Sequence, residues 1–162
     1  MTDDGMMTKK AETLRGLTGD EAARDMAVLE LTADASHLRD VQAFVKAQLK
    51  AARCSERSEM IIDIIVEEIF VNITSYAYAD SSGKVTVAAG LTDDESALVI
   101  IFVDEGTPYN PLAKADPDVT AEASDRAIGG MGILMVKKMA DGMTYRYQNG
   151  QNVLIITKKL ED

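Results

Sequence analysis

The stretch GKVTVAAGLTDDESALVIIFVDEG, Gly83–Gly106, decides the fold because its hydrophobic pattern is that of strands. Two segments rich in Val, Ile and Ala lie on either side of the polar turn TDDES, Thr92–Ser96. The second segment is apolar throughout, which is typical of a central strand buried on both faces. The sequence therefore predicts two consecutive strands joined by a short turn.

The residues before this pair have the three-to-four spacing of helices instead. Ser55, with an acidic residue after it, is typical of a helix start, and this helix should reach about Ala77. Its apolar positions are Met60, Ile61, Ile64, Ile65, Ile69 and Ile73. An earlier helix, capped by Asp34 or Ser36, should run to about Arg53.

The two ends of the chain differ in character. Residues 1–25 are polar and weakly patterned, so we interpret them as a flexible or loosely helical extension of a domain at residues 26–162. Met26–Ala33 alternates enough to predict a first strand. At the other end, MTYRYQNGQNVLIITKK, Met143–Lys159, predicts a hairpin because Asn-Gly at its tip is a strong hairpin signal.

A long segment without helical or strand pattern, Thr107–Ile128, holds all three prolines. Loops of this length in compact domains are usually functional lids. The segment GGMGILMVKKMAD, Gly129–Asp141, then opens a helix at a glycine cluster. Because the strands come in adjacent pairs, we expect a mixed, largely antiparallel sheet with helices on one face, an α+β two-layer sandwich.

Composition excludes several classes of protein. The chain has 162 residues, a net charge of -10 and a pI of about 4.6, and it lacks the clustered Lys and Arg that direct nucleic acid binding requires. Its longest apolar run, ALVIIFV, is too short to span a membrane, and its start lacks the apolar core of a signal peptide. A single cysteine, Cys54, permits no internal disulfide. We therefore expect a cytoplasmic protein.

Polar residues interrupt the second helix in EEIFVNITSYAY, Glu67–Tyr78. At about 100° per residue, Glu68 and Asn72 lie within roughly 40° of each other, whereas Glu67 lies about 140° from Asn72. The pair fits a carboxylate that orients a nucleophile and an amide oxygen that ligates a hard cation such as Mg²⁺. An exposed polar stripe is the alternative.

A second polar cluster, VDEGTPYN, follows the apolar strand. Asp104 ends the strand, and Gly106 lets the backbone pass close to a ligand. A carboxylate at a strand end can accept a hydrogen bond from an exocyclic amine and so select adenine. An ordinary strand-to-turn Asp-x-Gly is the alternative.

The glycine cluster is the third candidate. Gly129, Gly130 and Gly132 lie at a helix start, where free N–H groups and the helix dipole favour phosphate. No Gly-Lys-Ser/Thr follows, so the cluster is not a P-loop, and the preceding lid makes a Rossmann fingerprint unsuitable. A flexible hinge at a helix start is the alternative.

Taken in order, these features resemble the GHKL ATPase superfamily and, more closely, its small anti-sigma factor serine/threonine-protein kinases. The resemblance runs from Val28 to Leu160 and is most specific in DRAIGGMGILMVKKMADGMTYRYQNGQNVLIITKKL, Asp125–Leu160. It implies a Bergerat-type fold that binds ATP and Mg²⁺. It also implies homodimerisation, a sigma factor as one partner, and a STAS-domain anti-sigma factor antagonist whose Ser or Thr is phosphorylated.

The resemblance implies roles for the residues around the phosphates. Glu68 would be the general base, and Asn72 would bind Mg²⁺. Gly130 and Gly132 would lie against the phosphates, and Arg126 in the lid would reach the γ-phosphate.

It implies roles around adenine too. Asp104 would accept from the adenine amine, Gly106 would allow close approach, and Thr157 on the last strand would support the site. One departure is Tyr76, which stands where many relatives carry His or a basic residue.

His37 offers another reading, because SHLRD, Ser36–Asp40, echoes the phospho-acceptor box of histidine kinases. The 35 residues from His37 to Asn72 leave no room for a dimerising helical hairpin. We therefore expect a partly exposed histidine in a first helical turn, and not a complete sensor histidine kinase.

Three functions remain open at this point. The first is a kinase of the anti-sigma type. The second is a non-catalytic, nucleotide-gated module that sequesters a sigma factor or another regulator. The third is an α+β domain with no nucleotide site.

Overall fold

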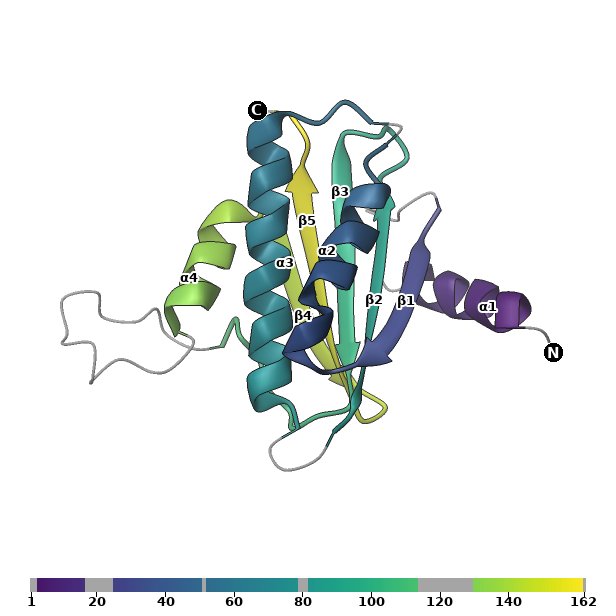
Figure 1. Ribbon diagram of the computed structural model, residues 1–162, viewed down its shortest axis with the longest axis vertical. Helices are drawn as coiled ribbons and strands as arrows, with labels where there is room; N and C mark the ends of the chain where they lie inside the picture. Colours follow the sequence, from purple (N-terminus) through teal and green to yellow (C-terminus); the bar gives the residue numbers. More distant parts are fainter. Residues whose placement is uncertain (1–2, 17–24, 51, 79–81, 114–129, 162) are drawn as a thin grey trace.

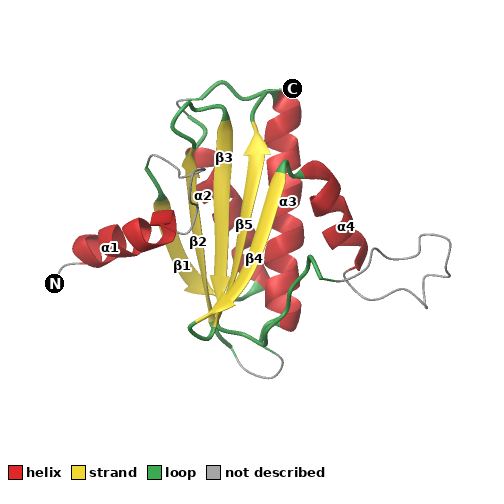
Figure 2. Ribbon diagram, turned by 180° about the vertical axis from the view of Figure 1, so that it is seen from behind, coloured by secondary structure: helices red, strands yellow, loops and turns green. Residues whose placement is uncertain are grey.

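The computed structural model describes residues 3–16, 25–50, 52–78, 82–113 and 130–161. Its elements are α1 (Asp3–Arg15), β1 (Ala27–Thr32), the 3-10 turn η2 (Ala35–His37), α2 (Leu38–Ala47), α3 (Glu56–Tyr76), β2 (Lys84–Leu91), β3 (Ala97–Asp104), α4 (Gly130–Met139), β4 (Gly142–Gln148) and β5 (Gln151–Lys159). Helices α2, α3 and α4 lie on one face of a single sheet (Figures 1 and 2). The predicted α+β two-layer sandwich is confirmed.

The sheet has five strands in the order β1-β2-β3-β5-β4. All four pairings are antiparallel, so the described strands contain none of the parallel pairs that a mixed sheet would have. Strand β3 is central, with β2 and β5 on either side. This position explains why its sequence is apolar at every residue before Asp104.

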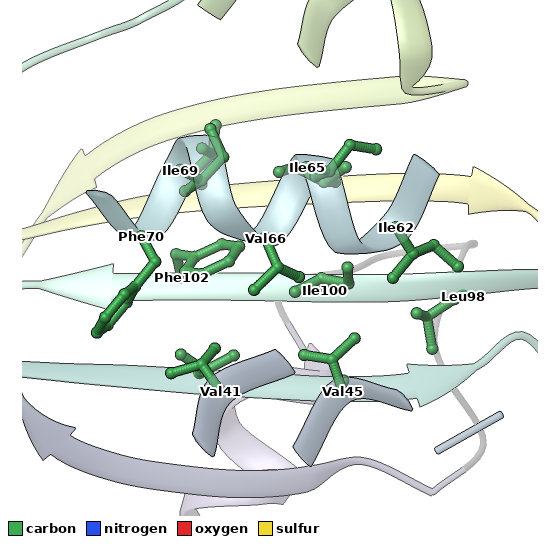
Figure 3. Close-up of a cluster of buried hydrophobic side chains, with 14 of the residues drawn as sticks. Val41, Val45, Ile62, Ile65, Val66, Ile69, Phe70, Leu98, Ile100 and Phe102 are labelled. Atoms are coloured by element: carbon green, nitrogen blue, oxygen red, sulfur yellow. The ribbon is translucent and has the colours of Figure 1, made fainter. Parts of the chain in front are cut away.

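The core fills both sides of the sheet. On the helical side, Val41 and Val45 of α2 and Ile62 and Val66 of α3 lie close to β3, as Figure 3 shows. The β3 residues on this side are Leu98, Ile100 and Phe102. Alternate residues of β3 and β5 form a second buried cluster on the other face, consisting of Leu14 of α1 with Ala88, Val99, Ile101, Val103, Val153 and Ile155. Strands β3 and β5 are therefore apolar on both faces.

Helix α3 begins where the sequence predicts. Ser55 is its N-cap, and its side-chain oxygen accepts a hydrogen bond from the Ser58 backbone N–H at 3.0 Å. The helix ends at Tyr76, with Ala77 as its C-cap. Its buried apolar positions recur at helical spacing and turn one face toward the sheet; they are Ile62, Ile65, Val66, Ile69 and Phe70.

The preceding helix is shorter than predicted. Asp34 caps η2 by accepting from the Ser36 N–H at 2.8 Å, and α2 ends at Ala47, well before Arg53. Beyond Ala47 the backbone bonds change to three-residue spacing, as in the bond from the Leu49 N–H to the Lys46 carbonyl at 3.0 Å. Such bonds tighten and end an α-helix.

The remaining local predictions concern the two ends. Asn149 has φ 53° and Gly150 has φ 75°, the left-handed values that a two-residue hairpin turn requires, so the predicted hairpin is confirmed. Part of the extension forms α1, which packs Leu14 into the second cluster and pairs Lys10 with Glu30 of β1.

Candidate functional site

A cavity of about 180 Å³ opens between the C-terminal half of α3, the end of β3 and the β4–β5 hairpin. Its apolar walls include Ile69, Ile73, Phe102, Ile133 and Leu154. Its polar lining includes Asn72, Asp104, Tyr145 and Asn152. Concave, mostly apolar sites with a few converging polar groups are typical ligand sites.

Asp104 lies in this cavity as the last residue of β3, on the helical face of the sheet, and only 7% of it is exposed. Its Oδ1 accepts hydrogen bonds from the Gly106 N–H and from Asn152 Nδ2, both at 2.9 Å. Burial raises the pKa of the carboxyl, whereas the bonds from Asn152 and Gly106 lower it. Asp104 therefore supplies a buried hydrogen-bond acceptor to an apolar cavity.

The backbone at Gly106 passes close to another segment of the protein and not to the cavity. A Cβ atom on Gly106 would lie 2.2 Å from the Ala77 carbonyl oxygen at the end of α3. The next residue, Thr107, donates its N–H to the same oxygen at 2.9 Å. The glycine lets the chain after β3 pass under the end of α3.

Asn152 of β5 lies opposite Asp104 in the β3–β5 register, and it is not among the residues predicted from sequence. Its Nδ2 also donates to the Gly106 and Thr107 carbonyls, at 3.3 and 3.1 Å. Its Oδ1 accepts from the Tyr109 N–H at 3.1 Å and from the Tyr145 hydroxyl. A polar residue directly before the apolar run VLII of β5 was the only signal for it.

Thr157 lies away from the predicted adenine site. Thr157 pairs with Val99 and Gly142, roughly 17 Å along β5 from Asn152 at about 3.3 Å per residue. Its side chain has the parity of Ile155, which belongs to the cluster on the other face of the sheet. Thr157 therefore does not line the cavity, and Asn152 occupies the position beside Asp104.

Glu68 and Asn72 lie on α3 as predicted, with Glu68 half-buried and Glu67 exposed. Asn72 lines the cavity. Glu68 lies against α4, since a Cβ atom on Gly132 would come within 2.0 Å of Glu68 Oε2. The structure thus brings Glu68 and Gly132 together, in the first helical turns of the α4 that begins at Gly130.

Some predicted site residues lie outside the described part of the chain. Arg126, Gly129 and most of the predicted lid belong to residues 114–129. The described start of the lid contributes Thr107, Pro108, Tyr109 and Pro111 to the cavity wall.

The polar side chains near the cavity differ in how well they suit a metal ion and a nucleotide. In the described ranges, no group of three or more His, Cys, Asp or Glu residues could hold a metal ion. Mg²⁺ is commonly held by one or two side chains together with substrate phosphates and water. The side-chain oxygen of Asn72 fits that mode, and the apolar cavity with its buried carboxylate fits a purine.

Comparison with known proteins identifies the class. A sequence model of the histidine kinase-like ATPase domain family matches residues 31–158, so the chain belongs to this family. A structure of the RsbU and RsbW domains of a Mycobacterium tuberculosis protein has the same fold, with a TM-score of 0.56 at 18% identity over 82% of this chain and 32% of that chain. The resemblance drawn from the sequence motifs is confirmed.

Two curated relatives show which members of this family resemble the chain in sequence. The anti-sigma F factor of Clostridium acetobutylicum is 28% identical over 98 residues, which are 60% of this chain and 67% of the relative. The serine/threonine-protein kinase BtrW of Bordetella bronchiseptica is 22% identical over 129 residues, which are 80% of this chain and 90% of the relative. The chain is thus similar both to an anti-sigma factor and to a serine/threonine-protein kinase. None of its described helices is long and apolar enough to cross a membrane.

Proposed function

We propose that this protein is an ATP-binding, Mg²⁺-dependent serine/threonine-protein kinase of the anti-sigma type. It transfers the γ-phosphoryl group to a Ser or Thr of a STAS-domain anti-sigma factor antagonist. The observation that carries this proposal is the buried carboxylate of Asp104 in an apolar cavity that Asn72 also lines. The names of the two relatives, an anti-sigma factor and a serine/threonine kinase, support the choice of reaction.

The cavity would hold adenine. A purine is flat and largely apolar, which suits walls made by Ile73, Phe102 and Leu154. Asp104 is the buried acceptor that an exocyclic amine requires, because an unpaired buried amine would be costly. Asn72 lines the same cavity, so the ribose and phosphates would leave the cavity toward α3 and the start of α4.

The residues next to the cavity would serve the phosphates. The N–H groups in the first turn of α4, which begins at Gly130, favour an anion. Asn72 would provide a Mg²⁺ ligand, and bound Mg²⁺ supplies charge neutralisation in phosphoryl transfer. Glu68 would accept or orient the proton of the attacking hydroxyl. Arg126 would reach the γ-phosphate.

The test compares two adjacent carboxylates of α3. Purified protein is incubated with Mg-ATP and a serine-bearing STAS protein encoded beside it, and phosphoserine is measured. Glu68→Gln should lower the transfer rate by roughly a hundredfold or more while Mg-ATP still binds. Glu67→Gln is the matched control and should behave as wild type, because Glu67 is exposed on another face of the helix. Wild-type protein that transfers no phosphate would refute the kinase assignment.

A second candidate is a non-catalytic module that holds a sigma factor when nucleotide is bound. The similarity to the anti-sigma F factor, whose name mentions no kinase activity, favours this second candidate. This module would bind a sigma factor in a nucleotide-dependent way in both wild type and Glu68→Gln. Homodimerisation belongs to either proposal and is checked by the molar mass in solution.

A further inference from the structure

We propose that Asn152 is the positioning residue that makes Asp104 selective for a 6-aminopurine. It does so by occupying one carboxylate oxygen and presenting the other to the cavity. This inference rests on the proposed nucleotide site and concerns a residue for which the sequence motifs assign no role. Its basis is the pattern of hydrogen bonds at the junction of β3 and β5.

The amide of Asn152 is fully used within the protein. Nδ2 has two hydrogens, and its acceptors are Asp104 Oδ1 at 2.9 Å, the Thr107 carbonyl at 3.1 Å and the Gly106 carbonyl at 3.3 Å. Oδ1 accepts from the Tyr109 N–H and the Tyr145 hydroxyl. With 7% of the residue exposed, Asn152 has no capacity left for a ligand. Its contribution is therefore to hold other groups.

The neighbours also fix which way the amide points. Two of the partners of Nδ2 are backbone carbonyls, of Gly106 and Thr107, which can only accept. One partner of Oδ1 is the Tyr109 backbone N–H, which can only donate. A flipped amide would place acceptor against acceptor and donor against donor, so a single orientation is compatible with this environment.

The fixed orientation of Asn152 determines which oxygen of Asp104 can meet a ligand. Both hydrogen bonds that it receives from described residues end on Oδ1, from Asn152 and from Gly106. That leaves Oδ2 as the acceptor for a ligand in the cavity. Adenine offers a donor from its 6-amino group, whereas a 6-oxopurine offers an acceptor that a carboxylate repels. Sites built on such a buried polar group discriminate strongly against the wrong partner.

Asn152 also orders the chain after β3. Through Gly106, Thr107 and Tyr109 it ties the beginning of that segment to the hairpin, where Tyr145 of β4 completes the network. A carboxylate held in place before the ligand arrives binds with a smaller loss of conformational entropy. Removing the amide should therefore weaken ATP binding and reduce the preference for ATP over ITP together.

The test measures the affinities of Mg-ATP and Mg-ITP by calorimetry for wild type, Asn152→Asp and Asn152→Ser. Asn152→Asp keeps the side-chain size but sets a carboxylate against the acceptors of Asp104, Gly106 and Thr107. At about pH 7.5 it should weaken Mg-ATP binding roughly tenfold or more and bring the ATP:ITP ratio toward one. Asn152→Ser can still donate one bond and should lose less. Thr157→Ser, on the opposite face of the same strand, is the control.

A pH comparison separates positioning from a general loss of structure. The ionisable groups around this junction are Asp104 at the end of β3, Glu105 and Tyr109 after it, Tyr145 and Tyr147 on β4, Tyr76 at the end of α3 and Tyr78 just beyond it. A carboxylate introduced at position 152 faces acceptors, so it should gain a proton more readily than usual as the pH falls and then donate again. Its variant should therefore regain ATP affinity and thermal midpoint relative to wild type between about pH 7.5 and 5.5.

Two outcomes overturn the inference, and they are distinguishable. If wild-type protein binds neither nucleotide, the proposed function and this inference are both refuted. The positioning role alone is refuted if wild-type protein prefers ATP and the Asn152 variants keep the same ATP affinity and ATP:ITP ratio at both pH values. In that case the proposed nucleotide site stands.

Discussion

The carboxylate of Glu68 lies against the backbone of α4 at Gly132, so close that a Cβ atom there would come within 2.0 Å of Oε2. These residues are far apart in the sequence and belong to two different motifs, the polar pair of α3 and the glycine cluster of α4. The contact places the proposed general base beside the proposed phosphate seat. The Glu68 carboxylate can lie here only because Gly132 has no Cβ atom.

Gly132→Ala should therefore separate catalysis from stability. The atom that the new methyl group meets is the far end of a flexible side chain, so Glu68 can turn away and the fold should survive. Alanine also favours a helix over glycine by up to about 1 kcal/mol, which should keep or raise the thermal midpoint. The phosphoryl transfer rate should fall roughly tenfold or more, because Glu68 is displaced.

The control for this change is Gly142→Ala, where the added Cβ would meet only Thr157 at an ordinary 3.6 Å. It should leave transfer unchanged. Transfer by Gly132→Ala at the wild-type rate would show that the contact between Glu68 and α4 has no catalytic role.

Gly106→Ala should have the opposite profile and destabilise the fold. Its Cβ would lie 2.2 Å from the Ala77 carbonyl oxygen, a backbone atom that also accepts from the Thr107 N–H. Because neither backbone segment can move freely, the free energy of unfolding should fall by roughly 1–3 kcal/mol. Urea denaturation measures it. Gly16→Ala, where a Cβ meets nothing within 4 Å, should be neutral.

Much of the fold could be predicted because its determinants are local. The Ser55 cap and the spacing of Ile62, Ile65 and Ile69 define α3 within a few turns of chain. The Asn-Gly turn defines the β4–β5 hairpin because both residues require positive φ. The position of Asp104 at the end of β3 could be predicted because this residue ends the apolar run.

The error at Thr157 shows what local patterns omit. Asn152 meets Asp104 across a separation of 48 residues, so the contact depends on the register between β3 and β5. Register is readable from sequence when one face of a strand is polar, because a one-residue shift exchanges the faces. Strand β5 is apolar on both faces, with Ile155 on one and Ile156 on the other. Its sequence therefore does not reveal which residues face the cavity.

The β2–β3 turn gives a pH prediction remote from the site. Asp94 Oδ1 accepts from the Thr92 hydroxyl and from both the hydroxyl and the N–H of Ser96. The bonds from Ser96, and then that from Thr92, lower the pKa of Asp94 to about 2. A lowered pKa means that the ionised form favours the fold. This stabilisation is therefore present above the ordinary pKa and is lost as the pH falls toward 2.

Asp94→Ala should consequently lower the thermal midpoint at neutral pH and leave Mg-ATP affinity unchanged. Asp94→Asn keeps an acceptor oxygen and should fall between alanine and wild type. The difference between wild type and Asp94→Ala should shrink as the pH approaches 2, and a difference independent of pH would contradict the role of the ionised carboxylate.

Asp104 should respond to pH in the opposite sense, because burial raises its pKa. The protonated form favours the nucleotide-free fold, so this contribution to stability is present below the ordinary pKa and is lost as the pH rises through the raised one. Adenine needs the ionised form. Mg-ATP affinity should accordingly fall as the pH drops into that same window, while the free protein gains stability from this group.

Asp104→Asn tests, at neutral pH, how the Asp104 charge affects both the stability of the free protein and its affinity for Mg-ATP. The amide is neutral and nearly isosteric, and its oxygen can still accept from Gly106 and Asn152, which now donate to Oδ1. The free protein should therefore be at least as stable as wild type, because no charge is buried. Mg-ATP affinity should fall roughly tenfold to a hundredfold, since a charged acceptor is lost. A variant that keeps wild-type affinity would show that Asp104 does not contact the base.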